Sequence, residues 1–211
     1  MNRKLAITLS VIATVAGIAL GLHLQARQGT GAPEPPAIPG LLWPHPKEVA
    51  PFRLTDSAGE VFDQDRLRGH WSLLFFGYTH CPDVCPSTLA TLARTTKLLE
   101  GDGELPQVVF VSVDPQRDEP QRLGEYVRYF DPRFLAVTAP EAPLLSLTRQ
   151  LGVLSLKVED PQGGDYLVDH SASIFLIDPR LRVVAVLSPP HEAGELARRY
   201  RAIRAFIESG P

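Results

Sequence analysis

Short apolar segments alternate with amphipathic segments along the chain after residue 52. Two of the apolar runs, 71–77 (WSLLFFG) and 107–113 (QVVFVSV), are too short for typical helices and are rich in aromatic and β-branched side chains, as in strands buried on both faces. Between these runs, apolar and small side chains recur at helical spacing: Leu89, Leu92, Thr96 and Leu99. The alternation predicts an α/β domain built on one hydrophobic core.

The segments that follow continue this order. We expect helices at 119–129 and 143–151, strands at 174–178 and 183–187 joined by a turn, and a final helix at 193–208. Asp118 precedes Pro120 and is predicted to be the N-cap of the first of these helices. Ahead of the first buried strand, 52–54 and 60–62 flank a turn and predict a β-hairpin. The complete order predicts a thioredoxin-like α/β sandwich, a central sheet flanked by helices, with an N-terminal β-hairpin extension.

The N-terminal residues predict a single membrane helix. Residues 1–4 carry Arg3 and Lys4, and an uncharged apolar stretch follows at 5–24. As a helix this stretch would be about 30 Å long, which matches the hydrocarbon core of a bilayer. Because positive residues favour the cytoplasmic side, we expect residues 1–4 in the cytoplasm and the remainder in the periplasm of a bacterium, anchored in the inner membrane.

A cleaved signal peptide is the alternative interpretation of residues 5–24. The apolar run exceeds the usual signal core of about 7–15 residues, and the sequence after it, Leu24-Gln25-Ala26, is a poor cleavage site. A retained anchor is therefore favoured. Residues 25–51 are rich in proline and show no apolar period, so they predict an extended tether, and the folded domain is expected at 52–211.

Composition excludes some classes of function. The formal net charge is -3 and the sequence pI is about 6.1, so no basic surface for nucleic acid is expected. The chain has only two cysteines, which cannot form a stabilising disulfide framework in a domain of this size. The two thiols are therefore candidates for chemistry.

Cys81 and Cys85 lie where the strand that ends at Gly77 passes into the following helix. This is the edge of the sheet where open α/β folds place their sites. Residues four apart on one helical turn share a face, so the two sulfurs can approach one another, and the helix N-terminus stabilises a thiolate. Two inert buried thiols and a simple disulfide are the alternatives, although a disulfide across so short a loop would stabilise little and would more readily be redox-active.

His170 precedes the strand predicted at 174–178. In a thioredoxin-like sheet, the loop before this strand faces the helix N-terminus that carries the cysteines, so the three side chains are expected to converge. Asp169 is expected to fix the imidazole tautomer through a hydrogen bond to the ring nitrogen that does not bind the metal. A lone histidine is more often an ordinary surface residue, and the fold is what favours a ligand role here.

Three motifs in this order resemble the Sco/SenC family, whose members are copper chaperones for the assembly of cytochrome c oxidase. They are FFGYTHCPDVCP at 75–86, VSVDPQRD at 111–118 and VDHS at 168–171. The resemblance covers the chain from about Leu42 to the C-terminus. It implies a thioredoxin-like fold, a membrane anchor, copper bound by Cys81, Cys85 and His170, and delivery to the CuA centre of oxidase subunit II, with an upstream copper donor as a further partner.

The proposed ligand set agrees with the chemistry of copper. Thiolates select Cu(I) or zinc, and an added imidazole also suits Cu(II), so the set can serve copper in both oxidation states. Structural zinc sites normally have four protein ligands, and the sequence offers three. A thiol:disulfide reductase and a copper or redox sensor remain alternative functions. Against the reductase, the Cys-x-x-x-Cys spacing is one residue longer than in dithiol oxidoreductases, and no proline lies at 168–173.

Other polar residues near these motifs are weaker candidates. His80 is expected to point away from the thiols. Asp114 and Asp118 are expected to be turn and cap residues rather than ligands, with a partner contact through an exposed acidic loop as the alternative. Three other histidines are expected to have no role in the site: His45, His70 and His191.

Overall fold

The structure is a computed structural model that describes residues 14–19, 33–159, 163 and 165–210. The chain divides into two units, residues 37–204 and a second unit of residues 1–36 with 205–211. Residues 14–19 are helical, and the rest of the expected anchor at 5–24 lies outside the described residues. Among the described residues, no helix combines the length and apolar character that a membrane span requires.

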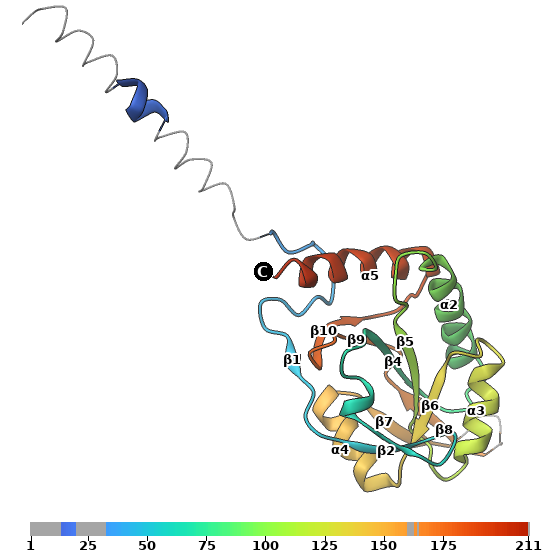
Figure 1. The fold of residues 1–211 in the computed structure, drawn as a ribbon. Helices are drawn as coiled ribbons and strands as arrows, with labels where there is room; N and C mark the ends of the chain where they lie inside the picture. The colour runs from blue at the N-terminus through green and yellow to red at the C-terminus, as the bar shows by residue number, and fades with distance from the viewer. Residues whose placement is uncertain (1–13, 20–32, 160–162, 164, 211) are drawn as a thin grey trace, which may run out of the picture. The chain divides into compact units, whose positions relative to one another are not determined.

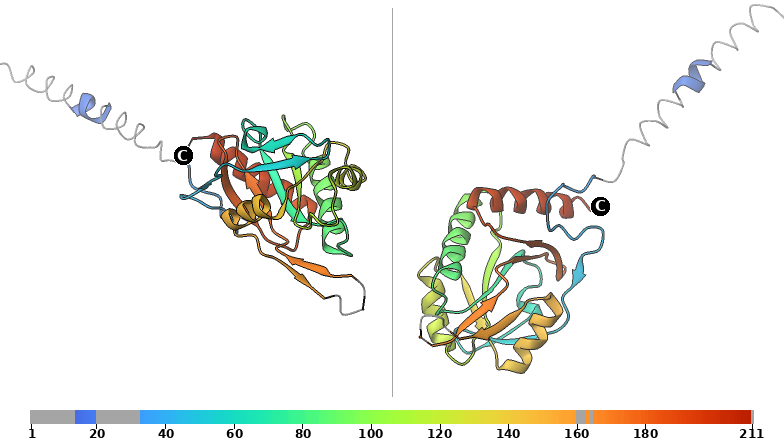
Figure 2. Two further views of the ribbon diagram at one scale, coloured as in Figure 1. Left: turned by 90° about the horizontal axis from the view of Figure 1, so that it is seen from below. Right: turned by 180° about the vertical axis from the view of Figure 1, so that it is seen from behind.

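An eight-stranded sheet forms the centre of the first unit (Figures 1 and 2). Its strands follow the order β1-β10-β9-β4-β5-β6-β2-β3. Their bounds are β1 Lys47–Glu48, β2 Arg53–Asp56, β3 Val61–Asp63, β4 Ser72–Gly77, β5 Gln107–Ser112, β6 Leu135–Thr138, β9 Ile174–Ile177 and β10 Arg182–Leu187. The helices are η1 Gln64–Arg66, α2 Val84–Leu98, α3 Pro120–Arg128, α4 Glu141–Leu151 and α5 Ala193–Glu208.

The core lies around β4, which is buried along its whole length. This strand pairs in parallel with β5 and antiparallel with β9, so both of its edges are hydrogen-bonded. Phe75, Phe76 and Phe110 are fully buried on these strands, and Leu89 and Leu92 of α2 pack into the same core. The predicted central elements and the thioredoxin-like class are thereby confirmed. The buried strand β4 leads through a short loop to the start of α2.

The predicted N-terminal hairpin is also present. β2 and β3 pair antiparallel, and β2 joins the main sheet through β6, a strand that the sequence analysis did not predict. The second half of the expected tether at 25–51 is part of the folded domain. Gly40 and Leu42 form backbone hydrogen bonds with β10, and β1 pairs with the same strand. Val49 is 8% exposed and belongs to the core. The domain therefore begins well before residue 52.

A second hairpin was not predicted. β7 (Ser155–Val158) and β8 (Leu167–His170) form a two-stranded sheet of their own, with Ser155 opposite His170. The left view of Figure 2 shows this hairpin, in amber and orange, projecting from the rest of the domain. It carries the predicted histidine ligand at the last position of β8.

Candidate metal centre

The two cysteines lie at the junction of β4 and α2. After Gly77 the chain turns through a hydrogen bond from the Cys81 N–H to the Tyr78 carbonyl (3.3 Å), and α2 begins at Val84. Cys81 therefore precedes the helix, and Cys85 is its second residue. The Cys85 backbone N–H, one of the free donors of the first helical turn, points to the Cys81 sulfur at 3.4 Å. The helix N-terminus thus stabilises a thiolate at Cys81, as the sequence predicted.

His170 reaches the same place from the β7–β8 hairpin. Its Nε2 lies 3.3 Å from the Cys85 Sγ, and the ligand atoms of Cys81, Cys85 and His170 all lie within 4.8 Å of one another. Among the described residues, this is the one group of three or more such side chains close enough to hold a metal. The structure therefore brings the three predicted residues together.

The surroundings of the imidazole differ from the prediction. Its Nδ1 lies 3.2 Å from the backbone carbonyl of Ser171, whereas Asp169 is exposed. The backbone carbonyl takes the orienting position expected for Asp169, because side chains alternate along β8 and Asp169 points away from the site. The imidazole ring also packs edge-on against the rings of Tyr78 (centroids 5.9 Å apart) and Phe75 (6.2 Å).

The two thiols have unequal acidity. The hydrogen bond with the Cys85 thiol lowers the pKa of Cys81 to about 4, and contacts with His170 and the Cys85 N–H act in the same direction. The same contact and burial raise the pKa of Cys85, which then remains a thiol that donates to the Cys81 thiolate. Cys85 is fully buried and Cys81 is partly exposed, so an incoming ion or partner reaches Cys81 first.

This donor set suits a soft or borderline metal ion. Two sulfurs and one imidazole nitrogen already lie close together, and metal–sulfur bonds of about 2.3 Å with a metal–nitrogen bond of about 2.0 Å need only small further movements. The set can hold Cu(I) through the sulfurs and Cu(II) with the nitrogen added. Three protein ligands leave a position open for exchange.

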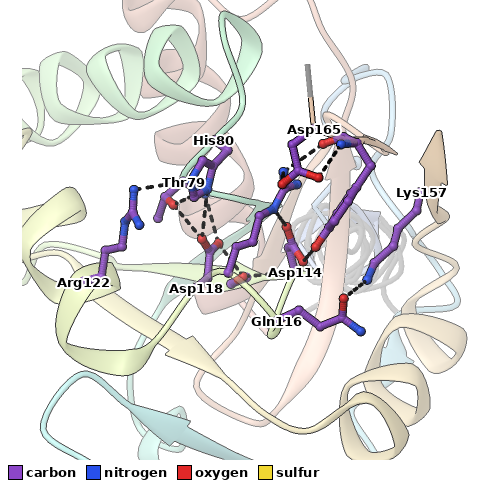
Figure 3. A network of polar contacts seen from close by, with 11 residues as sticks. Thr79, His80, Asp114, Gln116, Asp118, Arg122, Lys157 and Asp165 are labelled. Atoms are coloured by element: carbon purple, nitrogen blue, oxygen red, sulfur yellow. Dashed lines mark hydrogen bonds and ion pairs between the residues drawn. The ribbon is translucent and has the colours of Figure 1, made fainter. Parts of the chain in front are cut away.

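Asp114 and Asp118 are buried, in contrast to the alternative that they form an exposed acidic loop. Asp118 accepts hydrogen bonds from the Thr79 N–H (2.9 Å), the Thr79 hydroxyl (2.6 Å) and the Ser112 hydroxyl (2.7 Å) (Figure 3). It is not the N-cap of α3, because that position belongs to Glu119, which makes no capping hydrogen bond. Asp118 instead ties the loop that leads to Cys81 to the end of β5.

Asp114 belongs to a second cluster that the sequence analysis missed. Its carboxylate accepts hydrogen bonds from Arg117 Nε (2.5 Å) and from the Tyr166 hydroxyl (2.7 Å). Arg117 and Asp114 both lie in the VDPQRD motif, which was the available signal, but Tyr166 is 52 residues away from Asp114. Local sequence therefore gave no indication that these side chains meet.

The other histidines among the described residues lie outside the ligand cluster. His80 contacts Thr79 (3.2 Å) and Arg122 (3.3 Å). His70 lies 2.7 Å from Glu104 at the surface, and His191 Nε2 lies 2.8 Å from the Ala172 carbonyl. His45 is exposed.

Comparison with known proteins gives concordant results. The chain is 40% identical over 129 residues to the SCO2-like protein RP587 of Rickettsia prowazekii, covering 61% of this chain and 63% of that protein. It is 37% identical over 147 residues to protein SCO1 homolog 1, mitochondrial, of Arabidopsis thaliana, covering 69% and 44% respectively. The chain thus spans less than two thirds of the length of each of these relatives.

A solved structure shares the fold. The crystal structure of Arabidopsis thaliana ScoI with copper bound superposes with a TM-score of 0.70 and 36% identity, covering 74% of this chain and 98% of that chain. A family model described as SCO1/SenC matches residues 44–205, which include both cysteines and the histidine of the site. The chain belongs to the SCO1/SenC family.

Proposed function

We propose that this chain is a copper metallochaperone that binds one copper ion through the sulfurs of Cys81 and Cys85 and the Nε2 of His170. The observation that carries the proposal is the convergence of these three ligand atoms within 4.8 Å. The similarity to a family member solved with copper bound supports copper as the ion.

Release of the ion follows from the arrangement of the ligands. Cys81 and His170 are partly exposed, while Cys85 is buried. A partner's ligand can therefore enter the open position and displace the exposed ligands first, so the ion passes through a shared intermediate without dissociating into solvent. This stepwise exchange suits a carrier better than a closed four-ligand site would.

The client that we propose is subunit II of cytochrome c oxidase, at its CuA centre, and we propose an upstream protein as copper donor. Family membership supports the role in oxidase assembly. We also propose that residues 5–24 anchor the chain in the bacterial inner membrane with the domain in the periplasm, since they are uncharged and apolar and follow Arg3 and Lys4. The proline-rich residues that follow would let the domain reach a client in the same membrane.

The direct test is metal analysis of the reduced domain together with a thiol titration. We expect one copper per chain when both thiols are free and none after Cys81 and Cys85 are oxidised, because a disulfide consumes the electron pairs that bind the metal. Cys81→Ser and Cys85→Ser should each abolish tight Cu(I) binding, with His70→Ala as the control because that residue pairs with Glu104 at the surface. Stoichiometric copper on fully oxidised protein would overturn the assignment.

A thiol:disulfide reductase is the second candidate, and the unequal acidity of the two thiols favours it. Cys81, with its lowered pKa, would attack a client disulfide, and Cys85 would then displace the client thiol, leaving a Cys81–Cys85 disulfide. The two functions diverge at His170→Ala. Loss of oxidase activity in cells under limiting copper, nearly as large as in Cys81→Ser, supports the chaperone, whereas normal activity supports the reductase.

A further inference from the structure

The β7–β8 hairpin is fixed to the rest of the domain by little apolar burial. Among the described strands, β7 and β8 pair only with each other. The structure describes both strands in full, and within them Val168 alone is buried, while all of β7 is exposed. The hydrogen bonds between Ser171 and Leu154 join the two strands of the hairpin and do not join it to the main sheet. Apolar burial of the two strands therefore contributes little to the position of His170.

Polar contacts connect the hairpin to the rest of the domain, and Arg117 makes several of them. This residue lies after β5 and reaches the hairpin at the start of β8, where its Nη1 donates to the backbone carbonyl of Tyr166 (2.8 Å) and to the Asp165 carboxylate (3.1 Å). Its guanidinium carbon also lies 3.6 Å from the centre of the Tyr166 ring. The planar guanidinium thus contacts the backbone, a carboxylate and an aromatic face of the hairpin at the same time.

Asp114 anchors this contact on the body of the domain. Its side chain is fully buried, and its two oxygens accept from Arg117 Nε (2.5 Å) and from the Tyr166 hydroxyl (2.7 Å). Lys157 on β7 lies 4.6 Å from the centre of the same Tyr166 ring and donates to Gln116 (2.7 Å). Figure 3 shows Asp114 and Gln116, from the loop after β5, beside Lys157 of the hairpin. A charged pair with such buried geometry has few alternative arrangements.

The same guanidinium also lies over the ring of Tyr78, a neighbour of the imidazole. Arg117 lies 5.6 Å from the centre of the Tyr78 ring, and that ring packs edge-on against His170 at 5.9 Å. Tyr78 is 2% exposed and cannot move freely. Arg117 therefore contacts both the residues just before the strand that carries His170 and the aromatic ring against which the imidazole packs.

We propose that Arg117 is a positioning residue that fixes the β7–β8 hairpin and thereby holds the His170 imidazole beside the two thiols. It touches neither the metal nor a ligand atom, and its effect passes through the hairpin. The inference rests on the proposed copper site. It predicts that Arg117 determines the contribution of the nitrogen ligand, and hence Cu(II) binding, while Cu(I) remains on the sulfurs.

The test uses Arg117→Lys in the reduced full-length protein. Lysine keeps a cation beside the buried Asp114, so the variant is expected to fold, but it cannot contact Asp114 and the Tyr166 carbonyl together. We expect Cu(II) affinity to fall by about tenfold, within the range for residues that orient a metal ligand, and Cu(I) affinity to be unchanged. The electron paramagnetic resonance spectrum of the Cu(II) form should lose part of its imidazole nitrogen coupling.

The matched control is Arg133→Lys. Arg133 makes a similar fork with Asp131 (2.6 Å) and with Glu100 (3.2 Å), before β6 and away from the hairpin. It should leave both copper affinities unchanged. A second variant, Tyr166→Phe, removes only the hydroxyl that donates to Asp114 and retains the ring, so it should show a smaller loss of Cu(II) affinity in the same direction.

A double-mutant cycle with His170→Ala separates positioning from general destabilisation. If Arg117 acts through His170, Arg117→Lys causes no further loss of copper affinity once the imidazole is removed. Equal losses in the presence and absence of His170, or equal losses of Cu(I) and Cu(II), would overturn the inference while leaving the copper site in place.

Hydrogen exchange of the metal-free protein tests the hairpin without reference to copper. Arg117→Lys should speed exchange of the β7–β8 backbone amides by about tenfold relative to wild type, with β4 unchanged. If wild-type protein binds no copper, the proposed function fails, and the exchange result still decides whether Arg117 fixes the hairpin. Unchanged exchange in the hairpin would overturn the inference.

Discussion

Gly77 offers the sharpest test of how the site is packed. A Cβ at this position would lie 2.6 Å from the Cys85 Sγ and 2.7 Å from a ring carbon of Phe110. Gly77 has no positive φ, so alanine can adopt its backbone conformation and the cost of Gly77→Ala is purely steric. Overpacking of this kind destabilises a buried core by about 1–3 kcal/mol.

The effect on the metal site depends on which neighbouring side chain moves to relieve this steric clash. An ordinary contact requires a separation of about 3.4 Å or more, so the Cys85 sulfur must move by several tenths of an ångström while the Phe110 ring is held by the core. That sulfur lies only 3.3 Å from His170 Nε2, and its displacement should disturb the ligand geometry. We therefore expect Gly77→Ala to lower both the free energy of unfolding, by about 1–3 kcal/mol, and the affinity for copper.

Gly124→Ala is the matched control. A Cβ there would lie 2.6 Å from the Cβ of Ser57 and 2.8 Å from Arg128 Nη1, equally close but without a ligand nearby. The change also gains up to about 1 kcal/mol of helix propensity, which offsets part of the steric cost. Chemical denaturation and competitive copper titration of both variants give the comparison. Wild-type stability and copper affinity in Gly77→Ala would refute the reasoning.

Further predictions concern acidity and the N-terminal boundary. The rate at which iodoacetamide alkylates Cys81 should stay nearly constant from pH 8 to about 6 and fall to half near the pKa of about 4, while Cys85 stays unreactive. A midpoint of the rate near the ordinary thiol pKa would contradict this. The hydrogen-bonded guanidinium of Arg133 holds the pKa of Asp131 below its ordinary value. The ionised Asp131 therefore stabilises the fold at pH values above its ordinary pKa, and this contribution disappears as pH falls through the lowered pKa. Asp131→Asn should therefore destabilise at pH 7 and converge with wild type in acid, as measured by urea denaturation. Deletion of residues 1–51 should destabilise the domain in thermal denaturation because it removes β1 and the hydrogen bonds of Gly40 and Leu42 to β10, whereas deletion of residues 1–36 should not.

The cysteine pair could be predicted from the sequence because all of its signals are local. The apolar run of β4 ends at Gly77, and the four-residue spacing brings Cys81, just before α2, beside Cys85 in the first turn of that helix. His170 required one further step, the expectation that a thioredoxin-like sheet brings the loop before β9 to that helix. The structure brings the imidazole to the thiols, although on a strand and not in a loop.

The β7–β8 hairpin was not predicted, although one of its strands carries a strand-like pattern in the sequence. Leu154, Leu156 and Val158 alternate along the chain, yet they are 79%, 66% and 37% exposed. Hydrophobic alternation normally indicates one face buried against a core, whereas these side chains remain largely exposed. The segment at 40–49 was assigned to the tether because it contains prolines and its strand, β1, has only two residues, too few to give a recognisable pattern.

The buried aspartates show why the support of the site escapes sequence analysis even where its ligands do not. An aspartate followed by proline is typical of an exposed turn, and nothing nearby marks Asp114 as buried. Its burial is compensated by Arg117 and by Tyr166, far along the chain, and an unpaired carboxylate there would be strongly unfavourable. The thiols are therefore fixed by local structure, whereas the imidazole depends on a long-range contact. Within the proposed function, loosening that contact removes the nitrogen ligand first and leaves two sulfurs, a set that favours Cu(I) over Cu(II).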